Sequence, residues 1–582
     1  MKTTNRNLLL VLILTFALSF VNIAGEKNTV SGELGKKLDT YLTSITPFGF
    51  SGALLVAKKG EIVLNKGYGL AIRDKNIPNT SETIFCVGSI TKQFTAAAIM
   101  TLEMKQKLNT SDPIRKYFKG VPKDKWKITL HNLLTHTSGL VPDVGGDYEK
   151  YERDETVSKI LALPLAFQPG ERFEYSNVNY TLLAAIIEKV SGMPYEKYLY
   201  EKLFKPAGME WTGYRFPKWD QRTVAHWYVD EKDNDNSLSR LFPYWNLIGN
   251  GGILSTTDDM YKWHVALIGN KILSRDAKKK LFKPFLNDYA YGWDVLQREI
   301  GTLIQHNGGS ELGNNAEIRR YIDSNIVTIL LCNQHYNGRP LVDAVRGKIE
   351  DIVFGKDVIY PPEIMMSNTV DLKKFEGIYQ LESGGLFNIT NYGNAIRVKP
   401  SSQDAITSLV VPDGGDVTQA NELNAMAENI MEVAIKGDFE PLYDVMENKE
   451  NRMAPVRDLI EGRIKNEKER IGSVKKVEAL YTLPSARMEN ALETTIALRC
   501  EHGSIFFRLF WRDRKNIGVG PLDDAPPISF DFLPSSATEF IGYDIAIGRI
   551  MKINFTLDQK GSIVKIVVVS NTKSIEANRI EQ

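Results

Sequence analysis

The sequence has few cysteines and few histidines, and neither set has the spacing of a bridged or metal-bound site. Its three cysteines, Cys86, Cys332 and Cys500, are odd in number and far apart among 582 residues. Such a set excludes the disulfide framework that stabilises small secreted domains, and it is typical of small buried residues. The seven histidines are scattered without ligand spacing, so no metal centre is expected.

The chain also lacks a dominant sign of charge. Lys and Arg total 72 against 71 Asp and Glu, a formal net charge of +1 at pH 7. This balance gives no indication of nucleic acid or an anionic membrane as a partner. A hydrophobic fraction of 43% with 25% charged residues is typical of a soluble globular protein. At this length we expect roughly two to four structural units.

The one long apolar run lies at the N-terminus. Two basic residues precede a run from Leu8 to about Ile23, and the small residues Ala24 and Gly25 follow it. This pattern predicts a secretory signal peptide over residues 1–25, because the run is short for a membrane span. The protein is therefore expected to be secreted or periplasmic. An uncleaved anchor stays open, and only then would the protein associate with a membrane.

Apolar patterns indicate a sheet built from the two ends of the first large unit, with helices against it. Residues 52–69, GALLVAKKGEIVLNKGYG, are typical of a β-hairpin. A helical region follows from Ser89 to about Met104. Strand-like runs return between residues 303 and 332, and residues 340–354 have apolar residues at helical spacing. Together these elements favour a mixed unit of helices and one sheet over residues 35–355.

The remaining chain has a composite pattern. A Pro-Pro pair marks a linker over residues 356–370. We predict a small β-barrel-like module made of residues 371–412 with 529–570, interrupted by a helix-plus-sheet module of cystatin-like type over residues 413–528. Two consecutive small domains are the alternative, disfavoured because residues 371–412 alone are too few to close a barrel. These C-terminal modules could bind a ligand or dimerise.

The stretch SITK places Ser89 and Lys92 three residues apart, on one face of the predicted helix. A serine hydroxyl becomes nucleophilic at neutral pH only when a base removes its proton. The same spacing occurs at residues 473/476, 562/565 and 570/573, so spacing alone decides nothing. Only Ser89 leads into a helix that is apolar on nearly every side, where burial can keep Lys92 neutral and basic.

Two further patterns complete a candidate site. Tyr175 and Asn177 form a Tyr-x-Asn unit after a Pro-Gly turn, and His306 begins the only His-x-Gly of the chain, directly after an apolar run. Glycines there let a substrate lie against the strand, whose N–H groups can bind an oxyanion. The stretch LLTHTSGL is interpreted as a structural turn. Whether nearby aromatic residues line the cleft or pack in the core stays open for Tyr244, Trp245, Tyr291 and Trp293.

These motifs resemble the serine β-lactamase and penicillin-binding protein superfamily, in its class C β-lactamase, D-aminopeptidase and esterase branch. The resemblance spans about residues 35 to 355 and includes, in the family's order, FCVGSITKQFTAAAIMTLE, ITLHNLLTHTSGL, FEYSNVNYTLL, GNGGILSTTDDMYKW and HNGGSELG. It implies an α/β (α+β) domain of β-lactamase/transpeptidase type, with a central antiparallel sheet flanked by helices. It implies no metal or organic cofactor.

The resemblance also implies a role for each motif. Ser89 would be the acylated nucleophile and Lys92 its proton partner. Tyr175 would be the general base and later the acid for the leaving group. Asn177 would hold a substrate amide or carbonyl.

The third motif departs from the pattern. By the resemblance, His306 and Gly308 would lie along the substrate, and the backbone amides of Ser89 and Gly309 would form the oxyanion hole. Penicillin-recognising relatives have Lys followed by Thr or Ser where this chain has His306 and Asn307. Since histidine is neutral or only partly charged at pH 7, recognition of a substrate carboxylate is in doubt.

The principal hypothesis is therefore a secreted serine hydrolase that acts through an acyl-enzyme on a small-molecule or peptide ester or amide. Esterase, D-amino acid peptidase and β-lactamase-related activities all stay open. The alternative is a non-catalytic penicillin-binding or sensor protein whose C-terminal modules mediate binding. Intact Ser89, Lys92 and Tyr175 favour the enzyme.

Overall fold

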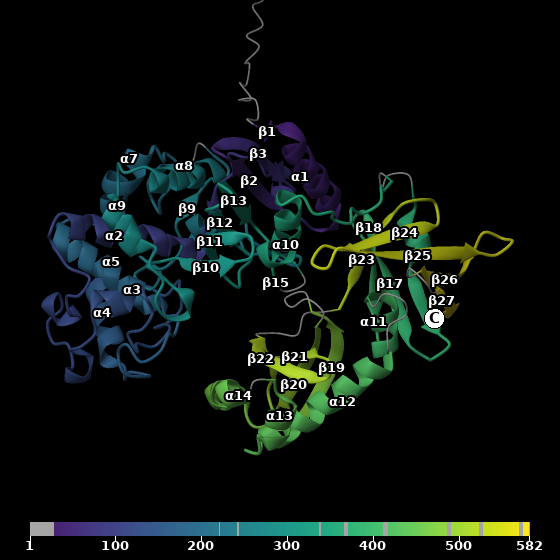
Figure 1. Ribbon diagram of the computed structural model, residues 1–582. Helices are drawn as coiled ribbons and strands as arrows, with labels where there is room; N and C mark the ends of the chain where they lie inside the picture. Colours follow the sequence, from purple (N-terminus) through teal and green to yellow (C-terminus); the bar gives the residue numbers. More distant parts are fainter. Residues whose placement is uncertain are drawn as a thin grey trace, which may run out of the picture.

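The computed structural model describes residues 28–219, 222–240, 244–336, 339–365, 370–410, 417–447, 449–485, 491–522, 528–569 and 574–580. The predicted signal peptide, residues 1–25, lies outside the described residues. Figure 1 shows an N-terminal domain (residues 28–355, purple to teal), a β-barrel and a helix-plus-sheet insertion (residues 403–522).

A seven-stranded antiparallel sheet forms the centre of the N-terminal domain. The strand β2 (Gly52–Lys58) pairs with β13 (Ile326–Cys332), so the two ends of the domain meet in the middle of the sheet. This is the arrangement expected from the apolar pattern. The full order is β1 (Thr29–Val30), β3 (Glu61–Tyr68), β2, β13, β12 (Asn315–Tyr321), β11 (Gly301–Gly309) and β10 (Asp294–Arg298).

Helices cover both faces of this sheet. Every residue of β12 and β13 is buried, as in strands packed on both sides. The helices α1 (Gly32–Ile45) and α10 (Leu341–Val353) share a core with one face, and the larger core on the other face includes α2 (Thr91–Met104), α5 (Asn177–Ser191) and α8 (Thr257–Ile268).

The predicted helix over residues 89–104 begins as a 3-10 turn, η2 (Gly88–Ile90), and continues as α2. Twelve consecutive residues of α2, Thr91 to Leu102, are buried. Phe94 anchors the helix through T-shaped ring contacts. Its ring centre lies 5.0 Å from that of Phe204 and 5.1 Å from that of Trp263. Side chains at the start of α2 therefore sit on a rigid element surrounded by core.

Eight strands form a closed barrel in the C-terminal part. They are β16 (Gly377–Leu381), β17 (Leu386–Tyr392), β18 (Ala395–Pro400), β23 (Phe530–Pro534), β24 (Glu539–Asp544), β25 (Arg549–Leu557), β26 (Ile563–Val569) and β27 (Ser574–Ile580). The strand β27 closes the barrel by pairing with β16. It lies beyond residue 570, where the sequence placed the end of this module.

The insertion leaves the barrel after β18 and returns at β23. It contains the helices α11 (Gln403–Val410), α12 (Val417–Ala434), α13 (Glu440–Val445) and α14 (Lys449–Ile471), followed by a four-stranded sheet of β19 (Val474–Pro484), β20 (Leu492–Cys500), β21 (Ser504–Arg512) and β22 (Lys515–Leu522). The predicted fold class, a helix-flanked antiparallel sheet with a C-terminal barrel, is confirmed. The domain boundaries stay a prediction.

The barrel contacts the N-terminal domain through its β24–β25 turn. Tyr543 and Ile545 are buried in the core formed by α1 and α10. The Tyr543 hydroxyl donates a hydrogen bond to the Ile359 carbonyl at 2.7 Å. Across the described ranges, no helix has both the length and the apolar character required to cross a bilayer.

Candidate active site

Ser89 lies at a junction where two backbone segments touch. It sits in η2, and Gly88 before it has a φ of 51°, in the left-handed region that favours glycine. A Cβ on Gly88 would clash with the backbone nitrogen of Gly309, and a Cβ on Gly308 would clash with the Val87 carbonyl. The glycines therefore let β11 approach the serine turn, which brings the backbone amides of Ser89 and Gly309 to one junction.

Lys92 projects from the first turn of α2 into a fully buried position. Its Nζ lies 3.0 Å from Ser89 Oγ, 2.7 Å from Asn177 Oδ1 and 2.8 Å from the Asn250 carbonyl oxygen. Burial lowers the pKa of Lys92 to about 7, although the nearby carboxylates Asp143 and Asp147 act to raise it. Near neutral pH a large part of this amine is therefore uncharged.

A neutral amine can satisfy all three partners of Lys92. Such an amine has two N–H donors and one lone pair, whereas a charged ammonium has three donors and no acceptor. The Asn177 amide oxygen and the Asn250 carbonyl can only accept, so they take the two N–H groups. The lone pair then remains for the hydroxyl of Ser89, 3.0 Å away. The geometry orients the base toward the nucleophile.

The Tyr175 side chain is held among aromatic rings beside Ser89. Its ring centre lies 4.3 Å from that of His136 and 6.2 Å from that of Tyr289. The residue is 36% exposed, yet its hydroxyl is in hydrogen-bonding contact with Ser89. Burial of the hydroxyl raises the pKa of Tyr175 far above its ordinary value, more than the contact with Ser89 lowers it. Tyr175 is thus a neutral phenol that can donate a proton.

His136 supports the Tyr175 ring from within the stretch LLTHTSGL. It is fully buried, and its Nδ1 accepts a hydrogen bond from the backbone N–H of Ser176 at 3.1 Å. Burial, together with the positive charge of Lys92 in its protonated form, holds the pKa of His136 well below its ordinary value. This stretch therefore carries an uncharged support for the site. The sequence predicted only a turn for this stretch, and its ring contact with Tyr175 was missed.

Asn177 links Lys92 to an acidic loop that the sequence did not single out. Its Nδ2 donates to Asp143 Oδ1 at 2.7 Å, while its Oδ1 accepts from Lys92. One N–H of the amide is left for a substrate carbonyl. Asp147, in the same loop, lines the pocket at Ser89. Burial raises the pKa of Asp147 to about 6, with further contributions from Glu311 and Asp143.

The third motif lies on β11 with alternating orientation. His306 is buried, and its Nε2 lies 3.0 Å from the Tyr289 hydroxyl. Its Nδ1 lies 2.5 Å from the Asn307 carbonyl oxygen and therefore acts as the donor there. Burial and the charge of Lys92 lower the pKa of His306 to about 3, so the ring is neutral. Asn307 is exposed on the other face of the sheet.

The pocket at the nucleophile is small, about 60 Å³. Ser89, Asn177, Gly252 and Gly309 are among its lining residues. The structure thus brings together all the predicted motif residues: Ser89, Lys92, Tyr175, Asn177, His306, Gly308 and Gly309. The aromatic residues whose place was open pack largely in the core, since Trp245, Tyr291 and Trp293 are buried there.

The other Ser-x-x-Lys pairs have different surroundings. Ser473 donates a hydrogen bond to the exposed Glu501, and Lys565 forms an ion pair with Glu576 on the barrel. The pair at residues 570 and 573 lies outside the described residues. Of these other pairs, the two with described side chains lack the buried lysine amine that lies beside Ser89.

Comparison with known proteins gives the same family. A family model described as Beta-lactamase matches residues 49–349. A "Putative penicillin-binding protein PbpX" of Bacillus subtilis is 38% identical over 262 residues, which cover 44% of this chain and 64% of that protein. "Penicillin-binding protein 4*" of the same organism is 30% identical over 390 residues, which cover 61% of this chain and 84% of that protein.

Other matches cover similar shares of this chain. "Protein flp" of Staphylococcus aureus is 30% identical over 275 residues, which cover 44% of this chain and 54% of that protein. A solved penicillin-binding protein from Bacillus halodurans has 28% identity and a TM-score of 0.44, covering 51% of this chain and 95% of that structure. The chain thus spans less than two thirds of PbpX and of flp.

The family match confirms the predicted superfamily, and with it the predicted enzyme class for the matched domain. The narrower assignment to the class C, D-aminopeptidase and esterase branch stays a prediction. The chain belongs to the beta-lactamase family, and its residues 49–349 form a serine hydrolase domain of the β-lactamase and penicillin-binding protein type.

Proposed function

We propose that this protein is a secreted or periplasmic hydrolase that transfers the acyl group of an ester or amide to Ser89 and then to water. One observation carries the proposal: a buried amine, Lys92, lies 3.0 Å from Ser89 Oγ, and two further oxygen acceptors lie within hydrogen-bonding distance of its Nζ. The location rests on the predicted signal peptide, residues 1–25.

In the acylation step, neutral Lys92 accepts the proton of the Ser89 hydroxyl as Oγ forms a bond to the substrate carbonyl carbon. The backbone N–H groups of Ser89 and Gly309 stabilise the negative charge on the carbonyl oxygen. The tetrahedral intermediate then collapses, and the bond to the leaving group breaks. Tyr175 donates its proton to that group and regains one from Lys92, which returns the amine to its neutral form.

This order of proton transfers reverses part of the role that the resemblance implied for Tyr175. Tyr175 was expected to act first as a base, which requires a phenolate. Because its pKa is raised and that of Lys92 is lowered, we assign the first proton to Lys92 and the donation to the leaving group to Tyr175. In the second step, water loses a proton through the same pair while it attacks the acyl carbon, and Ser89 recovers its hydroxyl.

The charge of the pocket favours an uncharged or cationic acyl group. His306 is neutral where penicillin-recognising relatives have a lysine, so no cation is placed at this position to hold a substrate carboxylate. Asp147 lines the pocket, and Glu311 and Asp143 act on it. A small acyl group with an amino substituent fits this field better than a carboxylate.

A substrate panel tests the proposed function directly. We expect the purified protein to release p-nitrophenol from small uncharged esters and to act on aminoacyl amides, with slower turnover of nitrocefin. Two relatives bear penicillin binding in their names, which is why a β-lactam belongs in the panel. Loss of all turnover in Ser89→Ala would support the proposal. No turnover of any substrate by the wild type would favour the non-catalytic alternative.

The preference for cationic acyl groups has its own test. Changing Asp147 to Asn should lower kcat/KM for an aminoacyl ester relative to its N-acetylated analogue by about tenfold, as expected when one nearby opposite charge is removed. In the wild type the preference should weaken as pH falls through about 6, where Asp147 takes up a proton.

The matched control for this change is Glu299→Gln. Glu299 is exposed in the turn between β10 and β11, at the opposite end of β11 from Gly309. Loss of the Glu299 carboxylate should leave unchanged the ratio of kcat/KM for the aminoacyl ester to kcat/KM for its N-acetylated analogue. An equal ratio in wild type and Asp147→Asn would refute the assigned role of Asp147.

A further inference from the structure

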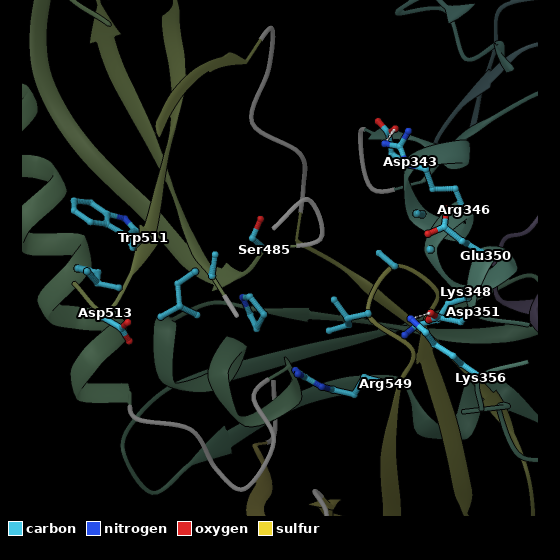
Figure 2. Close-up of a pocket in the computed structure, with 18 of the residues that line it drawn as sticks. Asp343, Arg346, Lys348, Glu350, Asp351, Lys356, Ser485, Trp511, Asp513 and Arg549 are labelled. Atoms are coloured by element: carbon cyan, nitrogen blue, oxygen red, sulfur yellow. Dashed lines mark hydrogen bonds and ion pairs between the residues drawn. The ribbon is translucent and has the colours of Figure 1, made fainter. Parts of the chain in front are cut away.

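A second cavity lies where the N-terminal domain, the insertion and the barrel meet. Its volume is about 1200 Å³, large enough for a drug-sized organic molecule. The outer side of α10 forms one wall, the insertion contributes Trp511 and Asp513, and Arg549 comes from the start of β25 (Figure 2). None of these residues belongs to the Ser89 pocket.

Most of the charged residues in this cavity already have a partner. Six cationic and four acidic side chains line it. The ion pairs are Arg346 with Asp343 at 2.5 Å, Arg298 with Glu350 at 2.9 Å, Lys356 with Asp351 at 3.4 Å and Arg514 with Glu422 at 2.6 Å. The remaining carboxylate, Asp513, lies beside Trp511, away from the α10 wall (Figure 2).

Two cations are left over, Lys348 and Arg549. Within the described ranges, Lys348 has no ion pair and Arg549 has no ion pair or hydrogen bond from its guanidinium. The Nη1 of Arg549 is buried without a partner. Asp544, opposite Arg549 in the β24–β25 pairing, is the acidic residue whose charge acts on it.

Both cations also line the same cavity. Lys348 packs against Gly548, the residue before Arg549: its Cε and Nζ lie 3.2 Å and 3.8 Å from the position of a Cβ on that glycine. A buried N–H without an acceptor, such as the Nη1 of Arg549, is unfavourable. An oxygen-rich anion in the cavity would supply an acceptor for Arg549 and a counter-charge for both cations through charge-assisted hydrogen bonds.

We propose that this cavity binds a small organic anion, with its carboxylate or phosphate oxygens held by Arg549 and Lys348. Apolar side chains on the insertion side, Leu423, Leu492 and Trp511, give the carbon skeleton of the ligand a surface to contact. Because the cavity touches all three units, the bound anion bridges the N-terminal domain, the insertion and the barrel.

Calorimetric titration of the full chain tests this site, with citrate as the carboxylate probe and pyrophosphate as the phosphate probe. Ionic strength is kept constant with sodium chloride. We expect saturable binding of at least one probe, and the tighter one identifies the source of the oxygens. Arg549→Gln and Lys348→Gln should each weaken that binding by about tenfold or more, as for the loss of a charged hydrogen bond.

Two controls separate this site from other sources of binding. Lys560→Gln removes one cation from the exposed β25–β26 turn, and Ser89→Ala alters the active-site pocket; both should bind like the wild type. The proposal is overturned if neither probe binds at millimolar concentration. It is also overturned if both cavity variants, folded as judged by circular dichroism, bind as tightly as the wild type.

Discussion

Replacing Lys92 with methionine should lower kcat/KM for an ester substrate by about 10³-fold, within the range for loss of a general base. Methionine has similar length, so it fills the buried space without the amine. The loss should appear in kcat, because the amine acts on Ser89 in the transition state. Steady-state kinetics on p-nitrophenyl acetate would measure it.

The pH dependence gives a second result for the same amine. Lys92 is a base only when neutral, and its pKa is about 7. The kcat/KM of the wild type should therefore rise as pH increases through about 7 and level off above it. In Lys92→Met this rise should vanish.

Lys125→Met is the control, since Lys125 is also buried but pairs with Asp124 in another part of the domain. It should retain the kinetics and the pH profile of the wild type. A wild-type profile that is flat from about pH 5.5 to about pH 8.5, roughly one and a half units either side of the Lys92 pKa of about 7, would contradict a neutral lysine base.

Replacing Tyr175 with phenylalanine should lower kcat/KM for an amide substrate by about 10² to 10⁴-fold, the usual contribution of a general acid. Amides should suffer more than p-nitrophenyl esters, because a poor leaving group needs the proton and p-nitrophenolate does not. The ring and its contact with His136 remain, so substrate binding should change little.

Tyr291→Phe is the matched control. The Tyr291 hydroxyl lies 2.8 Å from His131 Nδ1 within the core, so its loss should leave the ratio of amide to ester turnover unchanged. Equal losses on amides and activated esters in Tyr175→Phe would argue against the donation of a proton to the leaving group.

The order of the motifs and the central helix could be predicted from the sequence because they depend on local patterns. The apolar stretch after Ser89 became α2, and the spacing of Ser89 and Lys92 placed both side chains at its start. The strands at the two ends of the domain paired as expected, since β2 and β13 are apolar at nearly every position.

Other features of the site depend on contacts between distant segments. The ring contact of His136 with Tyr175 joins two loops, and Asp147 reaches the pocket from a third segment. Neither has a periodic pattern that would mark it. The close approach at Gly88 and Gly308 likewise requires knowing that β11 passes beside the serine turn.

The C-terminal part, too, could be predicted from the sequence only where local patterns determine the structure. The interruption of the barrel was predicted because residues 371–412 are too few to close it. The closing strand β27, Ser574–Ile580, was missed because its partner β16 is almost two hundred residues earlier, about the size of a whole domain. Pairing at that separation leaves no mark in the local sequence.

Mass spectrometry of the acid-quenched protein during turnover of p-nitrophenyl acetate tests the central claim most directly. We predict a mass increase of one acetyl group, located by peptide mapping at Ser89, absent in Ser89→Ala and unchanged in Ser473→Ala. Slow deacylation in Tyr175→Phe should increase the adduct. An acetyl group found at another residue, or equal labelling of Ser89→Ala and the wild type, would contradict the account.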